Sequence, residues 1–243
     1  MKPIYRKTFT LSDMEVDCFG RLKLSTLLYL AQEVAGNHSE LLGAGYNTLA
    51  HKGIFWAVTR HRVQITRLPV RGETVTVETW PMPTTRVAYP RSMVAYDAQG
   101  KELFRLISLW VLMDANTRAM VLPGKSDVIV EGLLTGSELD VPRSLAPRGM
   151  TDTALRTVTY SCLDRNGHMN NTKYLEWIDD LMPSDFHREH TLKEMTICYL
   201  AESWEGQKLD LHWDFLEEGV LQVDAYRENE EKQERVFSAR YLF

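Results

Sequence analysis

The 243-residue sequence lacks the features of a membrane protein, a disulfide-rich secreted protein or a nucleic-acid binder. It contains no run of 18 consecutive apolar residues, so it predicts no membrane-spanning helix. Its three cysteines are too few for a disulfide framework, and we expect free thiols in a cytoplasmic protein. The net charge of −5 argues against a general nucleic-acid binder, which would carry a basic excess.

The sequence also has little that indicates a metal or a cofactor. His187 and His190 resemble a metal-binding pair only loosely, because a zinc site takes three or four ligands. A lone cysteine on an apolar strand, such as Cys198, is more often a small packed side chain than a nucleophile. We therefore expect neither a metal nor a cofactor.

What the sequence does contain is one pattern of elements that occurs twice. In each half, alternating or apolar segments that predict strands surround one segment with apolar residues at helical spacing. In the first half the helix follows from a stripe running from Leu24 to Leu42, and the predicted strands are 4–12, 54–65, 74–80, 87–96, 102–113 and 118–122. In the second half the predicted helix is 171–182, and the predicted strands are 154–162, 192–201, 209–213, 220–226 and 235–243.

The two halves also share short motifs in the same order. Residues 17–22 (Asp-x-x-Gly-Arg-Leu) match residues 164–169 (Asp-x-x-Gly-His-Met), and each motif lies between a predicted strand and the predicted helix. Gly72 and Gly206 each precede a cleanly alternating strand. These matches indicate a two-copy duplication with an α+β fold, in which an antiparallel sheet wraps one helix in each copy.

The duplication predicts the domain boundaries. We expect a first domain at 1–123, a linker at 124–153 and a second domain at 154–243. The linker is rich in Gly, Pro, Ser and acidic residues, and only one short helical turn is expected in it, around 127–134.

A set of polar residues distinguishes the second copy from the first. The second copy has Asp164, Asn166, His168 and Glu202, whereas the first has Phe19, Arg21 and Leu68 in the places of the last three. A histidine and a carboxylate can move a proton, and donors near a helix start can stabilise a carbonyl oxygen that becomes negatively charged. The alternative is that Asp-x-Asn-Gly-His is only a polar turn before a helix, since turns favour these residues. A purely structural turn gives no reason for the set to occur in one copy alone.

The string Asp-x-Asn-x-His-x-Asn-Asn-x-x-Tyr at 164–174, in a duplicated helix-and-sheet pattern, resembles the acyl-acyl-carrier-protein thioesterases of plants and bacteria. The resemblance covers nearly the whole chain. It implies a tandem (double) hotdog fold and hydrolysis of the thioester that joins a fatty acyl chain to the phosphopantetheine of acyl carrier protein. It also implies a catalytic set of Asp164, Asn166, His168 and Glu202. Ser203 stands where plant members often carry a cysteine, and this favours attack by water over attack by a thiol.

These inferences give one mechanistic hypothesis and several alternatives. Glu202, helped by Asp164, deprotonates the water, while Asn166 and His168 with backbone N–H groups hold the carbonyl oxygen; whether His168 or Glu202 is the general base stays open. The first domain is expected to hold the acyl chain. We expect acyl carrier protein as the partner and no nucleic acid or membrane partner, and exposed sheet edges leave a homodimer open. The alternatives are an acyl-coenzyme A thioesterase, a hotdog dehydratase and a non-catalytic acyl-binding module.

Overall fold

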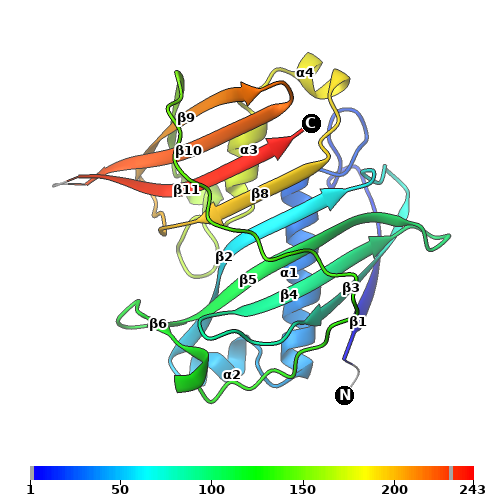
Figure 1. Ribbon diagram of the computed structural model, residues 1–243, viewed down its shortest axis with the longest axis vertical. Coiled ribbons are helices and arrows are strands. Elements are labelled where there is room, and N and C mark those ends of the chain that lie inside the picture. The colour runs from blue at the N-terminus through cyan, green and yellow to red at the C-terminus, as the bar shows by residue number, and fades with distance from the viewer. Residues whose placement is uncertain (1–2, 230–231) are drawn as a thin grey trace. The chain divides into compact units, whose positions relative to one another are not determined.

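The computed structural model describes residues 3–229 and 232–243. The chain forms two compact units, Met1–Pro142 and Arg143–Phe243. Each unit contains an antiparallel sheet with a helix against it (Figure 1). Among the described residues, no helix is both long enough and apolar enough to span a membrane.

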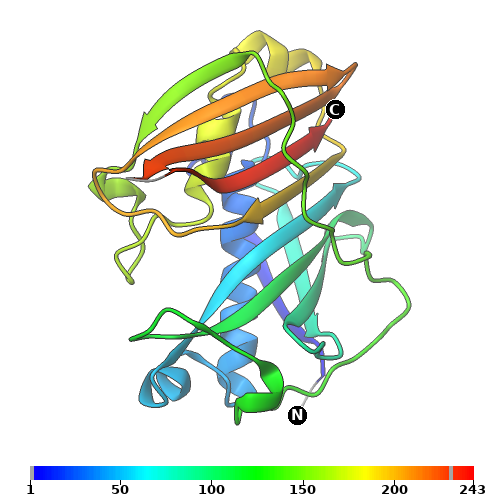
Figure 2. The same cartoon turned by 60° about the vertical axis from the view of Figure 1, so that its left-hand side comes forward.

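The first unit wraps a five-stranded sheet around a long helix. The strands pair antiparallel in the order β1-β3-β4-β5-β2, and their bounds are β1 Tyr5–Thr10, β2 Ile54–Ile65, β3 Thr74–Pro81, β4 Tyr89–Tyr96 and β5 Glu102–Asp114. The helix α1 (Leu24–Leu41) lies along one face of this sheet (Figures 1 and 2). The smaller elements of the unit are α2 (Tyr46–His51), the two-residue strand β6 (Met120–Val121) and the short helix η1 (Pro123–Lys125).

Apolar periodicity explains how this unit folds. Leu27, Leu28 and Val34 recur on one side of α1 and are almost fully buried. Val75 and Val77 alternate along β3 and have no exposed surface. Full burial of such a side chain contributes about 1.5–3 kcal/mol, so the helix and sheet faces stabilise each other. This core gives the loops at the ends of the strands a fixed base.

The second unit repeats the arrangement with a shorter helix. Its strands pair antiparallel in the order β8-β11-β10-β9-β7, and their bounds are β7 Asp152–Thr157, β8 Glu194–Tyr199, β9 Lys208–Glu217, β10 Val220–Asn229 and β11 Lys232–Leu242. The helix α3 (Lys173–Asp179) packs on the sheet through Tyr174, whose ring centroid lies 4.8 Å from that of Phe237. The helix α4 (Ser184–Glu189) and the short helix η2 (Tyr160–Cys162) complete the unit.

The fold class and most strands agree with the prediction, and the strand 54–65 is found with the predicted bounds. The second helix is shorter than predicted, because the chain turns after α3 and starts α4 only after Pro183. The predicted strand 154–162 begins at Asp152 and ends at Thr157, and residues 160–162 form η2 instead. Leu41 was predicted to belong to the buried stripe, but its side chain is 59% exposed.

The helical turn predicted at 127–134 is wrong. Residues 126–151, all of which the structure describes, contain neither helix nor strand. The backbone there bonds to another part of the first unit, since the Leu133 N–H donates to the Pro81 carbonyl over 2.9 Å. Val128 is buried in a cluster with Tyr89 and Leu112, so the segment packs against the first unit.

Candidate functional site

The loop that carries the predicted polar set is shaped by Asp164. Its Oδ1 accepts the N–H groups of Asn166 over 2.7 Å and of His168 over 3.3 Å. The Asp164 N–H in turn donates to the His168 carbonyl over 2.7 Å. Gly167 closes the turn at a φ of 79°, which glycine adopts without steric cost. The Asp164 carboxylate therefore fixes where Asn166 and His168 leave the backbone.

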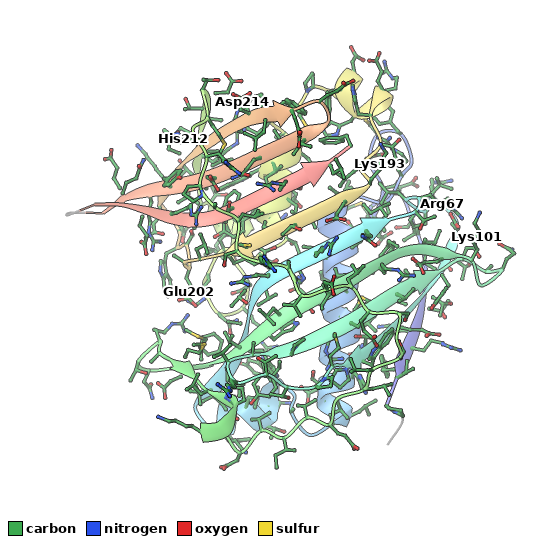
Figure 3. The ribbon with its side chains drawn as sticks, in the orientation of Figure 1. Arg67, Lys101, Lys193, Glu202, His212 and Asp214 are labelled. Carbon is green, nitrogen blue, oxygen red and sulfur yellow. The ribbon has the colours of Figure 1, made fainter. Side chains whose placement is uncertain are left out.

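A second loop, residues 200–207, carries Glu202. It leaves β8 where the Val236 carbonyl accepts the N–H groups of both Leu200 and Ala201. The two loops then pair, because the Met169 N–H donates to the Ser203 carbonyl over 2.8 Å and His168 forms a β-bridge with Trp204. This backbone pairing brings Glu202 next to the loop of His168. Figure 3 labels Glu202 past the end of β8.

The His168 imidazole lies between Glu202 and Trp204. Its Nδ1 is 3.4 Å from Glu202 Oε1. The Trp204 ring meets it edge-on, with ring centroids 4.0 Å apart. His168 is only 8% exposed, whereas Trp204 is 42% exposed and the Glu202 side chain 34%. The imidazole is thus in contact with both residues, and the carboxylate beside it is partly exposed to solvent.

Asn166 lies at the exposed tip of the first loop. Its Nδ2 donates to Asp164 Oδ2 over 3.4 Å, and a carboxamide nitrogen has a second N–H. The structure therefore gathers Asp164, Asn166 and His168 in one loop and brings Glu202 to His168 from another.

Several backbone N–H groups at the start of α3 are already paired within the unit. The N–H groups of Met169, Asn170 and Lys173 donate to the carbonyls of Ser203, Cys162 and Asn170. The N–H of Thr172 donates to the Asn170 side chain. The cap position of α3 is Thr172, and the Asn170 side chain stabilises the turn before it. The side chains of Asn166 and His168 remain as the predicted donors to a carbonyl oxygen.

The first unit builds the same pair of loops without the polar set. Three backbone hydrogen bonds of the first unit have equivalents in the second. The Leu22 N–H donates to the Pro69 carbonyl as Met169 donates to Ser203, and the Gly72 N–H donates to Leu11 as Gly206 donates to Val158. The Thr66 N–H donates to the Leu103 carbonyl as Leu200 donates to Val236. Asp17 also shapes its turn as Asp164 does, accepting the N–H groups of Phe19 and Arg21 over 2.9 Å each. The scaffold is thus duplicated in its hydrogen bonds, while the histidine and the glutamate occur only in the second unit.

Trp204 is a site residue that the motif alone does not predict. The signal for it is the same comparison between copies, because Val70 takes its place in the first unit and forms the equivalent bridge with Arg21. Ser203 is fully buried, which agrees with a structural rather than a nucleophilic position.

Among the residues that the structure describes, no three His, Cys, Asp or Glu side chains are grouped to hold a metal. The His187 Nε2 lies 2.9 Å from the Asp179 carbonyl, and His190 Nδ1 lies 3.0 Å from the Phe186 carbonyl. Cys162 and Cys198 are buried free thiols, and Cys18 is an exposed one.

Comparison with protein families agrees with this architecture. The model of the acyl-ACP thioesterase N-terminal domain matches residues 2–125, and that of the acyl-ACP thioesterase C-terminal domain matches residues 149–241. The chain belongs to the acyl-ACP thioesterase family. These two matches confirm the predicted family and the predicted tandem hotdog fold.

Relatives within the acyl-ACP thioesterase family are distant in sequence. A chloroplastic palmitoyl-acyl carrier protein thioesterase of Arabidopsis thaliana is 28% identical over 216 residues, covering 82% of this chain and 52% of the relative. A chloroplastic dodecanoyl-[acyl-carrier-protein] hydrolase of Cinnamomum camphora is 27% identical, covering 82% of this chain and 56% of the relative. The chain thus spans about half the length of the curated relatives it matches.

Solved structures match over the whole chain. An acyl-ACP thioesterase from Bacteroides thetaiotaomicron superposes with a TM-score of 0.88 at 27% identity, covering 99% of this chain and 98% of that one. The 12:0-ACP thioesterase from Umbellularia californica gives a TM-score of 0.83 at 22% identity and covers 100% and 97%, which is evidence for the fold alone.

Proposed function

We propose that this acyl-ACP thioesterase family member hydrolyses the thioester of fatty acyl-acyl carrier protein and releases a free fatty acid. The observation that carries the proposal is the 3.4 Å contact between His168 Nδ1 and Glu202 Oε1 on a duplicated scaffold. The first unit has Arg21 and Leu68 at these two positions, so the scaffold itself does not need the pair. Membership of the family and the relatives named above support the same activity.

In the proposed mechanism the oxygen of a water molecule attacks the thioester carbonyl carbon. The Glu202 carboxylate takes the proton from the water, and His168 beside it keeps the proton within the pair. The carbon–sulfur bond then breaks, and the pair returns the proton to the leaving thiolate, so that a fatty acid and a thiol are released. General acid–base steps of this kind contribute about 10²–10⁴ in rate.

The carbonyl oxygen carries negative charge in the transition state and needs donors. We assign this task to the side chains of Asn166 and His168. Asn166 supports the assignment because its Nδ2 has a second N–H besides the one that faces Asp164 Oδ2. Removing one such donor typically costs about 10²–10³ in rate.

For Asp164 we propose a different part from the one the sequence suggests. Its Oδ1 is bonded to two backbone N–H groups of its own loop, in the same way as that of Asp17. We therefore propose that Asp164 positions Asn166 and His168 and does not handle the water itself.

The first unit is proposed to hold the acyl chain. It keeps the scaffold without the acid–base pair, and α1 is a helix of 18 residues where α3 has seven. The thiol carrier is proposed to be acyl carrier protein, in line with the family.

Thiol release from matched substrates tests the proposal. We expect free thiol from a panel of acyl carrier protein thioesters of different chain lengths, and slower release from the corresponding coenzyme A thioesters. Faster release from coenzyme A would favour the acyl-coenzyme A thioesterase. If no thiol appears from either carrier, hydrolysis is contradicted, and water loss from a 3-hydroxyacyl substrate or binding alone becomes the better reading.

A further inference from the structure

We propose that Arg227 is a positioning residue that holds the 200–207 loop so that Glu202 and Trp204 stay against His168. Arg227 lies on β10, outside the two loops and outside the predicted polar set. The inference rests on the proposed function, because it concerns how the carboxylate of that site is placed.

Arg227 makes contacts in two directions. Its Nε donates to Glu234 Oε2 over 2.8 Å, and Glu234 lies directly opposite Arg227 on the neighbouring strand β11. Its Nη1 donates to the Glu202 carbonyl over 2.6 Å and to Gln207 Oε1 over 2.9 Å. Only 16% of the Arg227 side chain is exposed, so these bonds are largely shielded from water. Arg227 therefore ties the loop to a hairpin of the sheet.

The same bonds reach Trp204 through Gln207. The Gln207 Oε1 that accepts from Arg227 also accepts the Trp204 N–H over 3.1 Å. Arg227 thus fixes the backbone at Glu202 directly and the backbone at Trp204 through one side chain. Both of these residues touch the His168 imidazole.

The first unit holds its equivalent loop in a different way. Glu73 takes the place of Gln207, and its Oε2 accepts the Val70 N–H over 3.0 Å. The cation that binds Glu73 is Arg67, which is part of the loop itself and donates from Nη1 over 2.8 Å. Figure 3 labels Arg67 past the end of β2, as it labels Glu202 past the end of β8. Both copies therefore anchor this loop through an arginine, which lies on the loop itself in the first unit and on the sheet in the second.

The position of Arg227 has the opposite charge in the first unit. The strand register identifies the equivalent positions. Tyr96 pairs with Thr76, four positions after Gly72, and Tyr226 pairs with Asp210, four positions after Gly206. The next residue along is Asp97 in the first unit and Arg227 in the second. Asp97 Oδ1 accepts two backbone N–H groups of its own hairpin turn, and its Oδ2 lies 3.5 Å from Nη2 of the loop residue Arg67. The change to arginine accompanies the glutamate and the histidine in the same copy, and this links it to the site.

The physical consequence of losing Arg227 is a loop that is still closed but less fixed. The bonds of Gly206 and Ser203 to other parts of the unit remain. The Glu202 carbonyl and Gln207 Oε1 lose the hydrogen bonds from Arg227, so the Glu202 carboxylate and the Trp204 ring sample more positions relative to His168. A displacement of about 1 Å in a reacting group can cost about 10² in rate.

Kinetics with matched variants provides the first test. We expect Arg227→Met to lower kcat on an acyl carrier protein thioester by about 10–100-fold with little change in KM, because the substrate contacts are kept. Arg227→Lys keeps a donor for the Glu202 carbonyl and is expected to recover part of kcat. Arg67→Met removes the equivalent anchor in the first unit and is the control, with lowered stability against denaturant and kcat near that of the wild type.

Nuclear magnetic resonance provides a second readout that needs no turnover. The Trp204 ring shifts the carbon-bound protons of the His168 imidazole, and Trp204→Leu gives the unshifted reference. We expect Arg227→Met to move these resonances toward the reference, Arg227→Lys to move them less, and Arg67→Met to leave them unchanged.

The two readouts separate the possible failures. If Arg227→Met and Arg67→Met lower stability alike while kcat and the His168 resonances stay at wild-type values, Arg227 is only structural and the inference is overturned. If the wild type hydrolyses no thioester, the proposed function fails, and the resonances still decide whether Arg227 positions the loop. Should Arg227→Met not fold, Arg227→Lys, which does not reproduce the forked guanidinium, replaces it with a smaller expected loss of kcat and a smaller shift. Wild-type kcat and wild-type His168 resonances in Arg227→Lys would then overturn the inference.

Discussion

For His168 and Asp164, residue type and spacing predict where the side chains lie but not what each one does. The spacing of Asp164, Asn166 and His168 predicts a polar loop next to a helix, and the structure places them in one loop. Comparison of the two copies singles out Glu202, because the first unit has Leu68 at the equivalent position. The task of each residue does not follow from its type, because Asp164 bonds backbone N–H groups while Glu202 faces an imidazole.

The two aspartates provide a matched prediction for Asp164. We expect Asp164→Ala and Asp17→Ala each to lower the free energy of unfolding by about 1–3 kcal/mol, because each leaves two backbone N–H groups without a charged acceptor. Only Asp164→Ala is expected to lower kcat as well, since only that turn carries Asn166 and His168. Denaturant unfolding and thiol release on both variants check this, and a loss of kcat in Asp17→Ala as large as that in Asp164→Ala would contradict it.

At the scale of elements, strands were easier to predict than helices. The strand 54–65 is recognisable because β-branched and aromatic residues fill it between two breaks. The helix predicted at 171–182 corresponds to α3 alone, which already ends at Asp179, and α4 begins after Pro183, beyond the predicted range. The segment 127–134 looks locally helical, but tertiary contacts of Val128 and Leu133 decide its course, and such contacts are not visible in a local pattern.

One row of residues across the first sheet is polar where the second sheet is apolar. His61 on β2 pairs with Ser108 on β5, which pairs with Arg91 on β4. His61 and Arg91 are buried, and burial lowers the pKa of Arg91 to about 10. The equivalent row in the second unit is Met195, Tyr241 and Leu221.

Burial of His61 makes stability depend on pH. Burial lowers the pKa of His61 from 6.5 to about 3, so the folded protein keeps this imidazole neutral while the unfolded chain protonates it below pH 6.5. The folded state therefore loses stability as the pH falls from 6.5 toward 3, by about 2 kcal/mol between pH 7 and pH 5.

The variant His61→Met, which copies Met195 of the second unit, is expected to remove this loss. Denaturant unfolding of both proteins at pH 7 and pH 5 checks it. Equal falls in unfolding free energy for wild type and variant would show that His61 does not titrate in this way.

At the scale of the whole molecule, the internal repeat is what made the architecture predictable. The matching motifs near Asp17 and Asp164 indicate two copies of one unit. The shared hydrogen bonds of the two loop pairs agree with that interpretation. The boundaries at 123 and 154 stay predictions. The placement of the acyl chain in the first unit also stays a proposal, since it depends on side-chain packing that no motif encodes.

The oligomeric state of the chain also stays open to measurement at this scale. The strands β1 and β7 each pair with one neighbour in their sheets, and edge strands of this kind can pair between chains. A chain of 28.0 kDa is expected to give about twice that mass by light scattering if it is a homodimer. A mass near 28.0 kDa at micromolar concentration would show that the chain acts as a monomer.

A double-mutant cycle on turnover tests most directly whether His168 and Glu202 form one hydrolytic centre in the second copy. With a saturating acyl carrier protein thioester, we predict that Glu202→Gln and His168→Ala each lower kcat by about 10²–10⁴. Because the two side chains act as a unit, the double variant is predicted to lie within about tenfold of the slower single variant. Wild-type turnover by Glu202→Gln, or losses that multiply in the double variant, would contradict the account.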